Sequence, residues 1–435
     1  MMVYPQYKKT NLEWLENIPS EWEYGGLTKY LDSIVDYRGK TPEKVEEGIF
    51  LVTAKNIKHG QIDYSLSQEF VKIEEYEEVM RRGLPEIGDV LFTTEAPLGE
   101  VANVDRIDIA LAQRIIKFRG IENVLDNYYL KYWIQSHGFQ SNLRTFATGS
   151  TAAGIKASKL SSLQVLLPSY SEQKQIVLFL DNKVHEIDGL ITQKEQMISL
   201  LEEKRQSMII EAVTKGLNPN VKMKDSSVEW IGEIPESWNI KKIKYKFDIR
   251  KVIQPTEAPT VLSLTQKGLK VKDLNDFSGQ HAESYEKYQR VEIDDYVMNG
   301  MDLLTGYVDC AKFEGVTSPD YRVFRLRYPE ECHDYYLRYF QMCYFAKIFY
   351  GHGQGVSHLG RWRLQTDVFK GFPIPEPPID EQFAISKYLS VKEIEINEAI
   401  DMIKVQIQNL KDYRQSLIYE AVTGKIDVRD FEVEL

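Results

Sequence analysis

An internal duplication constrains this chain more than any other feature of its 435 residues. EWLENIPSEW at 13–22 returns as EWIGEIPESW at 229–238, and KRQSMIIEAVT at 204–214 returns as YRQSLIYEAVT at 413–423. The paired segments lie 216 and 209 residues apart, so the chain holds two collinear copies of one unit. Solenoid repeats are much shorter, about 20–50 residues. The duplication therefore predicts two domains, each with its own appendage.

Each copy opens with a strand-rich stretch that contains an aromatic helix. Short apolar runs such as GIFLVT and GDVLFTT in the first copy, and PTVLSLT and YRVFRLR in the second, are separated by Gly, Pro, Asn and Asp. Such punctuation is typical of strands joined by turns. YYLKY at 128–132 and YYLRY at 335–339 mark the helix of each copy. We predict two similar, compact α+β domains.

Each copy ends in a long helical stretch. From Glu172 in the first copy and Glu381 in the second, apolar residues recur at alternating steps of four and three. This spacing over several heptads predicts a coiled coil. The helices could span 172–213 and 381–422, which is roughly 63 Å each. We predict that they pack together as an antiparallel coiled coil; the alternative is that each apolar stripe packs on its own domain.

The predicted fold class is therefore α+β, with four consecutive segments. They are a globular domain at 1–168, a long helix at 169–217, a second globular domain at 218–377 and a second long helix at 378–435.

The charge balance and cysteine content exclude some classes of protein. Lys and Arg total 54 against 65 Asp and Glu, which gives a net charge of −11. A protein that coats DNA by bulk charge, or a polybasic membrane binder, would be basic, although local basic clefts fit an acidic body. Three cysteines cannot form a disulfide framework, and the N-terminal stretch lacks the apolar core of a signal peptide. We expect a cytoplasmic protein.

The motifs of several enzyme classes are absent from the sequence. It contains no GxxxxGK[ST] phosphate loop and no GxGxxG fingerprint after a strand. An adenine methyltransferase holds a flipped base with Asn or Asp followed by Pro-Pro-aromatic, and the nearest match is EPPI at 376–379. The sequence therefore favours a binding protein over a catalyst.

Cysteine and histidine gather in the second copy without the spacing of a zinc site. Cys310, Cys332, His333 and Cys343 form no CxxC or HxxxH arrangement, and Asn103 stands in the first copy where the second has Cys310. Buried structural cysteine is the simpler interpretation, so we expect no metal site.

The duplicated motifs together resemble one known family, the specificity subunits of type I restriction-modification systems. The resemblance rests on the EWxxxIPxxW opening of each half, on the helix entries PSYSEQ at 168–173 and PPIDEQ at 377–382, and on the RQSxIxEAVT helix ends. All three elements occur twice and in order, so the resemblance covers essentially the whole chain.

The resemblance implies a non-catalytic DNA-recognition subunit of a larger enzyme. Each globular domain would be a target-recognition domain that reads one half of a bipartite target in double-stranded DNA. The helices would set the spacing and dock two DNA adenine methyltransferase (modification) subunits, which bind S-adenosylmethionine, so this chain itself would hold no cofactor. Separate restriction subunits would supply the motor and nuclease. The alternative is a structural coiled-coil adaptor that binds only protein partners.

Candidate DNA-contacting residues are hydrogen-bond donors and stacking groups on the turns and loops, since Arg and Lys pair with guanine and Asn and Gln with adenine. They are Arg38, Lys40, Lys55, Asn56, Lys58, Gln113, Arg114, Ser150, Thr151, Lys156, Gln266, Lys267, Tyr321, Arg322, Gln354, Ser357, His358, Arg361 and Arg363.

Candidates for docking a partner subunit lie in the duplicated helix ends. They are Arg205, Gln206, Glu211, Arg414, Gln415 and Glu420. Arg205 and Arg414 occupy core positions of the stripe, so they could also fix the register of the helices.

Overall fold

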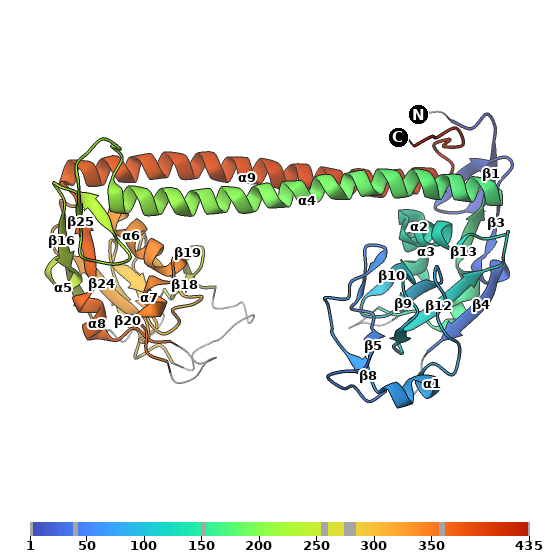
Figure 1. Ribbon diagram of the computed structural model, residues 1–435, viewed down its shortest axis with the longest axis horizontal. Coiled ribbons are helices and arrows are strands. Elements are labelled where there is room, and N and C mark those ends of the chain that lie inside the picture. The colour runs from blue at the N-terminus through green and yellow to red at the C-terminus, as the bar shows by residue number, and fades with distance from the viewer. Residues whose placement is uncertain are drawn as a thin grey trace. The chain divides into compact units, whose positions relative to one another are not determined.

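The computed structural model describes residues 3–433 with gaps at 38–41, 149–152, 254–259, 274–283 and 356–361. The chain divides into two compact units, here called unit 1 (1–195 and 405–435) and unit 2 (196–404). Each unit holds one globular domain and parts of both long helices (Figure 1). Among the described residues, no helix is long and apolar enough to cross a membrane.

A four-stranded antiparallel sheet in the order β10-β9-β12-β4 forms the centre of unit 1. Its strands are β4 (Leu31–Asp36), β9 (Val90–Thr94), β10 (Leu98–Asn103) and β12 (Ile115–Gly120). Every residue of β9 is buried, because the sheet is covered on both faces. Phe92 packs against Phe139 of α3 (His137–Phe146) on one face, and Leu91 joins Leu51 of β5 (Ile49–Val52) on the other.

Smaller elements complete unit 1. A second sheet has β11 (Ile109–Leu111) parallel to β5, and β5 antiparallel to β8 (Phe70–Val71). The two-stranded ribbons pair β1 (Tyr7–Leu12) with β2 (Leu15–Pro19), β3 (Glu23–Gly26) with β13 (Gln164–Leu167), and β6 (Ile57–Lys58) with β7 (Gln61–Ile62). The short helices are η1 (Leu27–Tyr30), η2 (Ile73–Glu75), α1 (Tyr76–Val79), α2 (Asn127–Gln135) and η3 (Ala157–Ser162).

Unit 2 repeats this architecture. Its central sheet has the order β22-β21-β24-β17, which matches β10-β9-β12-β4 strand for strand, and α6 packs on β22 as α2 packs on β10. The prediction of two similar α+β domains is confirmed. The central elements are β17 (Phe247–Arg250), β21 (Tyr296–Met298), β22 (Val308–Cys310), β24 (Arg322–Leu326) and α6 (His333–Phe345). The remaining elements are β14 (Met223–Asp225), β15 (Glu233–Pro235), β16 (Asn239–Lys242), α5 (Ile243–Lys246), β18 (Leu262–Thr265), β19 (Gly268–Val271), β20 (Gln289–Val291), β23 (Gly315–Thr317), α7 (Ile348–Gly351), α8 (Thr366–Gly371) and β25 (Pro373–Glu376).

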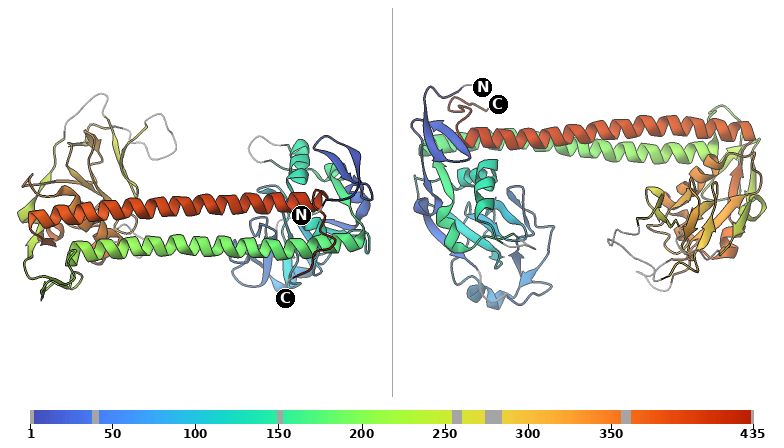
Figure 2. Two further views of the ribbon diagram at one scale, coloured as in Figure 1. Left: turned by 90° about the horizontal axis from the view of Figure 1, so that it is seen from above. Right: turned by 180° about the vertical axis from the view of Figure 1, so that it is seen from behind.

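The long helices are α4 (Tyr170–Lys215) and α9 (Ile379–Val422), and they lie side by side in both views of Figure 2. In unit 1, Lys194 Nζ donates to Gln406 Oε1 at 2.7 Å. In unit 2, Arg205 Nη1 donates to Asn397 Oδ1 at 3.0 Å. In these two contacts a later position on α4 meets an earlier one on α9, which confirms the predicted antiparallel packing.

The apolar stripe packs partly on the opposite long helix and partly on the globular domains, the two alternatives that the sequence left open. Ile187 and Ile191 are buried along the helix pair, whereas Ile198 and Leu201, which continue the stripe, are only half-buried. The helix ends instead pack on the domains: in unit 2, for example, the Tyr335 hydroxyl donates to the Val213 carbonyl at 3.0 Å. Each interpretation therefore holds for a different part of the helices.

Candidate nucleic-acid interface and helix joints

The duplicated Glu-Gln pair at each helix entry ties the helix to its domain. Gln173 is fully buried, and its Nε2 donates to two main-chain carbonyls at 2.8 and 3.0 Å while its Oε1 accepts from Asp126 N at 2.8 Å. Gln382 repeats the arrangement, accepting from Cys332 N at 3.1 Å. A side-chain amide both donates and accepts, so it can satisfy groups on both sides of the joint. The motif is architectural.

The duplicated IPxxW segment covers the end of a long helix. The helices end at Gly424 (φ +69°) and Gly216 (φ +76°), where the left-handed backbone favours glycine. A Cβ would lie 3.2 Å from the Trp22 ring at the first and 3.1 Å from the Trp238 ring at the second. Both tryptophans are fully buried, so they anchor the cores of their units. Within unit 1, the opening of the first copy therefore packs on the end of the second copy's helix.

Arg205 and Arg414 turn toward the opposite helix. Arg414 forms an ion pair with Asp188 in unit 1, and Arg205 contacts Asn397 in unit 2. Asp188 and Asn397 lie 209 residues apart, so the same contact occurs twice, once with a carboxylate and once with an amide. These contacts support the register-fixing interpretation of both arginines.

The other docking candidates differ in their exposure and in their hydrogen bonds within the chain. Gln206 and Glu211 are exposed on α4. Gln415 is exposed but donates to the Gln135 carbonyl at 2.8 Å, and the half-buried Glu420 accepts from Ser416. Their role in docking stays a prediction.

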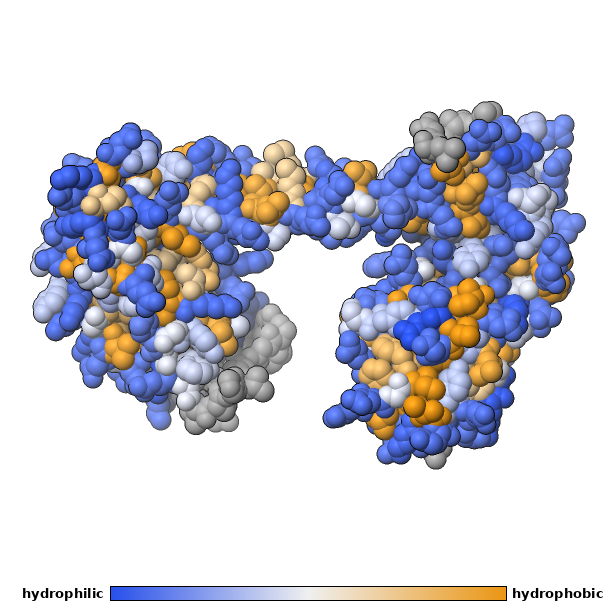
Figure 3. Space-filling view, in the orientation of Figure 1, coloured by the Kyte–Doolittle hydropathy of each residue, from blue (hydrophilic) through white to orange (hydrophobic). Residues whose placement is uncertain are grey.

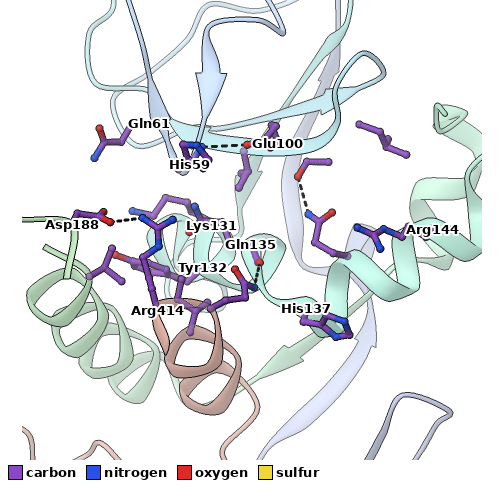
Figure 4. A pocket seen from close by; sticks show the side chains of 18 residues that line it. His59, Gln61, Glu100, Lys131, Tyr132, Gln135, His137, Arg144, Asp188 and Arg414 are labelled. Carbon is purple, nitrogen blue, oxygen red and sulfur yellow. Dashed lines mark hydrogen bonds and ion pairs between the residues drawn. The ribbon is translucent and has the colours of Figure 1, made fainter. Parts of the chain in front are cut away.

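A cavity of about 360 Å³ lies in unit 1 between the domain and its helix segments (Figure 4). Arg414 and Asp188 meet at one side of it, with Lys131 and Tyr132 of α2 close by. Lys131 Nζ lies 4.3 Å from the centre of the Tyr132 ring, and burial lowers the pKa of Lys131 although neighbouring carboxylates oppose this. The cavity is a polar joint between domain and helices.

Sequence reasoning missed the cation in this joint. Lys131 is the fourth residue of YYLKY, and unit 2 has Arg338 at the same place in YYLRY. Lys131 lies 3.8 Å from Asp181 of α4, and Arg338 lies 2.8 Å from Glu393 of α9. The repeated cation in an otherwise aromatic helix was the available signal.

Three DNA-contact candidates of unit 1 meet at one hollow. Lys55, Gln113 and Arg114 line a cavity of about 260 Å³ together with Lys44, which the sequence did not single out. Lys55 and Arg114 are exposed, and Arg114 Nε lies 2.9 Å from Glu95 Oε1. Lys44 Nζ is paired with Glu69 Oε2 at 2.6 Å, and Glu69 also lines the hollow. The cations and the Gln113 amide can contact phosphates or base edges.

Two candidates make structural contacts, which corrects the prediction for the fully buried Asn56, whereas DNA contact by Arg322 stays a prediction. Asn56 is fully buried, and its amide bonds the Thr53 and Asp63 main chain at 2.9 and 3.1 Å, so it shapes its own loop. Arg322 donates to the Leu364 carbonyl at 2.9 Å and lies 4.4 Å from the centre of the Phe369 ring. The Asn56 amide has no exposed polar edge, whereas Arg322 is half-buried.

Arg363 provides the clearest candidate surface of unit 2. Burial lowers the pKa of Arg322 to about 10, and the nearby charge of Arg363 acts in the same direction. Among the described residues, no ion pair joins either guanidinium to a carboxylate, and Arg363 is exposed. Gln354 exchanges main-chain hydrogen bonds with Arg363 at 3.0 Å and is exposed beside it. Gln266 and Lys267 are exposed at the β18–β19 turn.

The remaining candidates are less informative. Lys58 and Lys156 are exposed, and Tyr321 is half-buried. The others lie outside the described residues: Arg38, Lys40, Ser150, Thr151, Ser357, His358 and Arg361.

Comparisons with known proteins agree with this architecture. The type I restriction modification DNA specificity domain family matches residues 28–200. A putative type I restriction enzyme MjaX specificity subunit from Methanocaldococcus jannaschii is 24% identical over 438 residues, which covers 97% of this chain and 98% of that protein. The type I restriction enzyme MjaVIII specificity subunit from the same organism is 25% identical over 258 residues, covering 56% of this chain and 54% of that protein.

A solved structure shares the fold over nearly the whole chain. It comes from a study of complex assembly and conformational transition of the type I R-M system, with a TM-score of 0.68 and 15% identity, and the match covers 94% of this chain and 99% of that one. This likeness shows that the chain shares the fold of a protein from a type I R-M system. Over nearly its whole length, this chain is similar to the specificity subunits of type I restriction-modification systems. Such subunits are non-catalytic components that recognise DNA.

Proposed function

We propose that unit 1 and unit 2 each read one half of a bipartite target in double-stranded DNA, and that α4 and α9 set the distance between the halves. The observation that carries the proposal is the repeat of one sheet architecture with different exposed donors. Unit 1 gathers Lys55, Gln113 and Arg114, whereas unit 2 exposes Gln354 and Arg363. Different donors on the same scaffold fit half-sites of different sequence.

The Arg322–Arg363 pair favours an anionic or acceptor-rich ligand in unit 2. Two guanidinium groups close together repel each other, and a phosphate or the O6 and N7 atoms of guanine would offset that repulsion. Arg322 would hold Arg363 in place through the Leu364 main chain.

The long helices suit the role of a spacer. α4 has 46 residues, which is about 69 Å of helix. Paired helices are stiff, unlike a Gly/Ser-rich linker, and the major groove of DNA recurs about every 34 Å along one face.

Exposed apolar side chains on the helices support a docking role. Leu200 is 63% exposed and Met402 is 60% exposed, and Figure 3 shows apolar side chains along the surface of the helices. An apolar helix surface is typical of a protein–protein contact. We infer that two modification subunits, which bind S-adenosylmethionine, dock along the duplicated helix surfaces, and that restriction subunits join this complex.

A domain exchange tests the two-reader proposal. The chain is purified with modification subunits, and the methylated sites of a genomic library are mapped after residues 24–150 are replaced by the matching segment of a relative. One half of the target should change and the other should stay. The matched control replaces 240–355, which should change the opposite half. If either exchange alters both halves, or if methylation shows no sequence preference, the adaptor alternative is favoured.

Paired insertions test the spacer proposal. One heptad is inserted after Glu195 in α4 and one after Lys404 in α9, positions that lie 209 residues apart. The added helix is about 10.5 Å, which corresponds to about three base pairs at 3.4 Å each. The mapped spacer should lengthen accordingly while both half-sites stay the same. An active complex with an unchanged spacer would contradict the proposal.

A further inference from the structure

Three side chains that can bind a metal ion converge at one corner of unit 2. Asp294 lies in the turn before β21, Cys310 ends β22 and His333 begins α6. Their ligand atoms all lie within 4.8 Å of one another. They come from three separate elements, so only the fold brings them together.

The surrounding structure holds this corner in place. The Asp294 N–H donates to the Ala311 carbonyl at 2.9 Å, which keeps the turn beside β22. The Tyr296 hydroxyl donates to the His333 carbonyl at 2.7 Å, and the two rings stack at 5.9 Å with 6° between their planes. Tyr296 also pairs with Cys310 across the sheet. These contacts therefore hold the three elements close together at this corner.

Two features of the corner suit a cation. The Nδ1 atom of His333 is buried and has no hydrogen-bond partner among the described residues, which costs free energy unless a ligand satisfies it. The carboxylate of Asp294 lies within 4.8 Å of the Cys310 and His333 ligand atoms, so a positive ion there would be paired with a negative group.

The first copy shows what the corner looks like without such groups. Asn103 and Gly88 occupy the positions of Cys310 and Asp294, as the equivalent main-chain contacts of the two turns show. The Asn103 Nδ2 donates to the Gly88 carbonyl at 2.9 Å and to the Asn127 carbonyl at 3.2 Å, tying the turn to the start of α2. In unit 2 that amide is replaced by a thiol, which cannot make the same two bonds.

We propose that Asp294, Cys310 and His333 bind a divalent transition-metal ion, with Zn²⁺ preferred, which ties the turn to α6 in place of the amide. Thiolate, imidazole and carboxylate are the donors that Zn²⁺ takes in proteins. Tetrahedral coordination at about 2.0–2.3 Å separates donors by roughly 3.3–3.8 Å, so they must approach by about 1 Å. Binding releases the thiol proton to solvent. Asp294 is exposed, which leaves room for water as the fourth ligand.

Cobalt titration of the untagged, EDTA-treated full chain tests this proposal. Co²⁺ should give a thiolate-to-cobalt charge-transfer band that saturates at one equivalent and disappears on adding Zn²⁺. The C310N variant supplies the residue that unit 1 already uses at this position, so it should fold and lose the band. The C343A variant removes a buried thiol elsewhere and should keep the band.

A second control and a second measurement separate a site from non-specific binding. N103C places a thiol at the equivalent corner of unit 1, where no histidine is available, and should add no second band. By isothermal titration, Zn²⁺ should bind at least tenfold more weakly to C310N and H333Q than to the unchanged chain. Absence of the band in the unchanged chain, or its persistence in C310N at one equivalent, would overturn the proposal.

Discussion

Asp89 in unit 1 and Asp295 in unit 2 occupy equivalent positions, yet they are neutralised from different strands. Both are 1% exposed. Each accepts a hydrogen bond from an equivalent arginine, from Arg119 Nε at 2.7 Å and from Arg325 Nε at 2.8 Å. In unit 1 the second cation is Lys117, on the same strand as Arg119, with its Nζ 3.0 Å from Asp89. In unit 2 it comes from the neighbouring strand.

The second cation and a valine occupy exchanged positions in the two units, on two neighbouring strands. Lys117 of β12 faces Val35 of β4, whereas in unit 2 Val323 of β24 faces Arg250 of β17. Arg250 Nη1 reaches Asp295 at 3.2 Å. A buried carboxylate needs compensating cations, but the fold leaves open which strand supplies them. The two units therefore share the compensation of a buried carboxylate by two cations, but not the residue that supplies the second cation.

The two clusters differ in their access to water. The Lys117 side chain is 3% exposed, whereas those of Arg250 and Arg325 are 28% and 33% exposed. A cation that reaches water can regain hydration when its partner is lost. We therefore expect equivalent substitutions to cost more in unit 1.

The largest effect should follow from removing the buried carboxylate. D89N leaves Lys117 buried without a counter-charge and should lower the free energy of unfolding by about 3–5 kcal/mol. D295N should cost about 1–3 kcal/mol, because both arginines remain partly hydrated. Urea unfolding measures both values, and D32N, at an exposed position, should stay within about 0.5 kcal/mol of the unchanged chain. An equal loss of unfolding free energy in D89N and D295N would contradict the expected difference between the two clusters.

Moving the cation should be tolerated better than losing it. K117V removes one of the two cations beside Asp89 and should cost about 2 kcal/mol. Adding V35R reproduces the arrangement of unit 2 and should recover about 1 kcal/mol, since the two positions are direct cross-strand neighbours. A double-mutant cycle measures this recovery. Strictly additive losses would show that the unit 1 site accepts its cation from β12 alone.

The contribution of Asp89 should depend on pH. Burial alone would raise the pKa of Asp89, but hydrogen bonds from Arg119, the Glu86 N–H and Lys117 outweigh it and lower the pKa. The folded pKa thus lies below the unfolded value of about 3.9, so the stabilisation is complete above that value and is lost as the pH falls through the folded pKa. The stability difference between D89N and the unchanged chain should shrink by about 1.4 kcal/mol per pH unit in that range. A pH-independent difference would contradict this assignment.

The sequence predicts the fold better than it predicts the candidate site. The duplicated segments and the heptad spacing led to the two α+β domains and the paired helices, because those patterns record burial along a whole element. They did not reveal Lys117, since an RIIKFRG run does not say which buried acid lies beside its lysine. The prediction for Asn56 was wrong because the sequence does not show side-chain burial. An asparagine that shapes a turn and one that reads a base cannot be told apart without it.

The metal-ligand corner shows the same limit in another form. Asp294, Cys310 and His333 are 16 and 23 residues apart along the chain, so no short spacing signals them. Their convergence depends on the pairing of β21 with β22 and on the position of α6 against that sheet. Those are tertiary relations that a linear motif does not contain.

The smallest expected effect concerns the repeated arginine contacts of the helices. Across the helix pair, Arg414 faces the carboxylate of Asp188, whereas Arg205 faces the amide of Asn397 and pairs with Glu202 of its own helix. Because the Arg414 pair is partly exposed, R414A should lower the free energy of unfolding by only about 0.5–1 kcal/mol more than R205A. D188N gives unit 1 the amide of unit 2 and should remove most of that excess. At about 1 M salt, where the screening length is about 3 Å, the excess should also fall. Thermal unfolding at low and high salt measures it, and an excess that salt leaves unchanged would mean that Arg414 acts through packing of its aliphatic stem rather than through its charge.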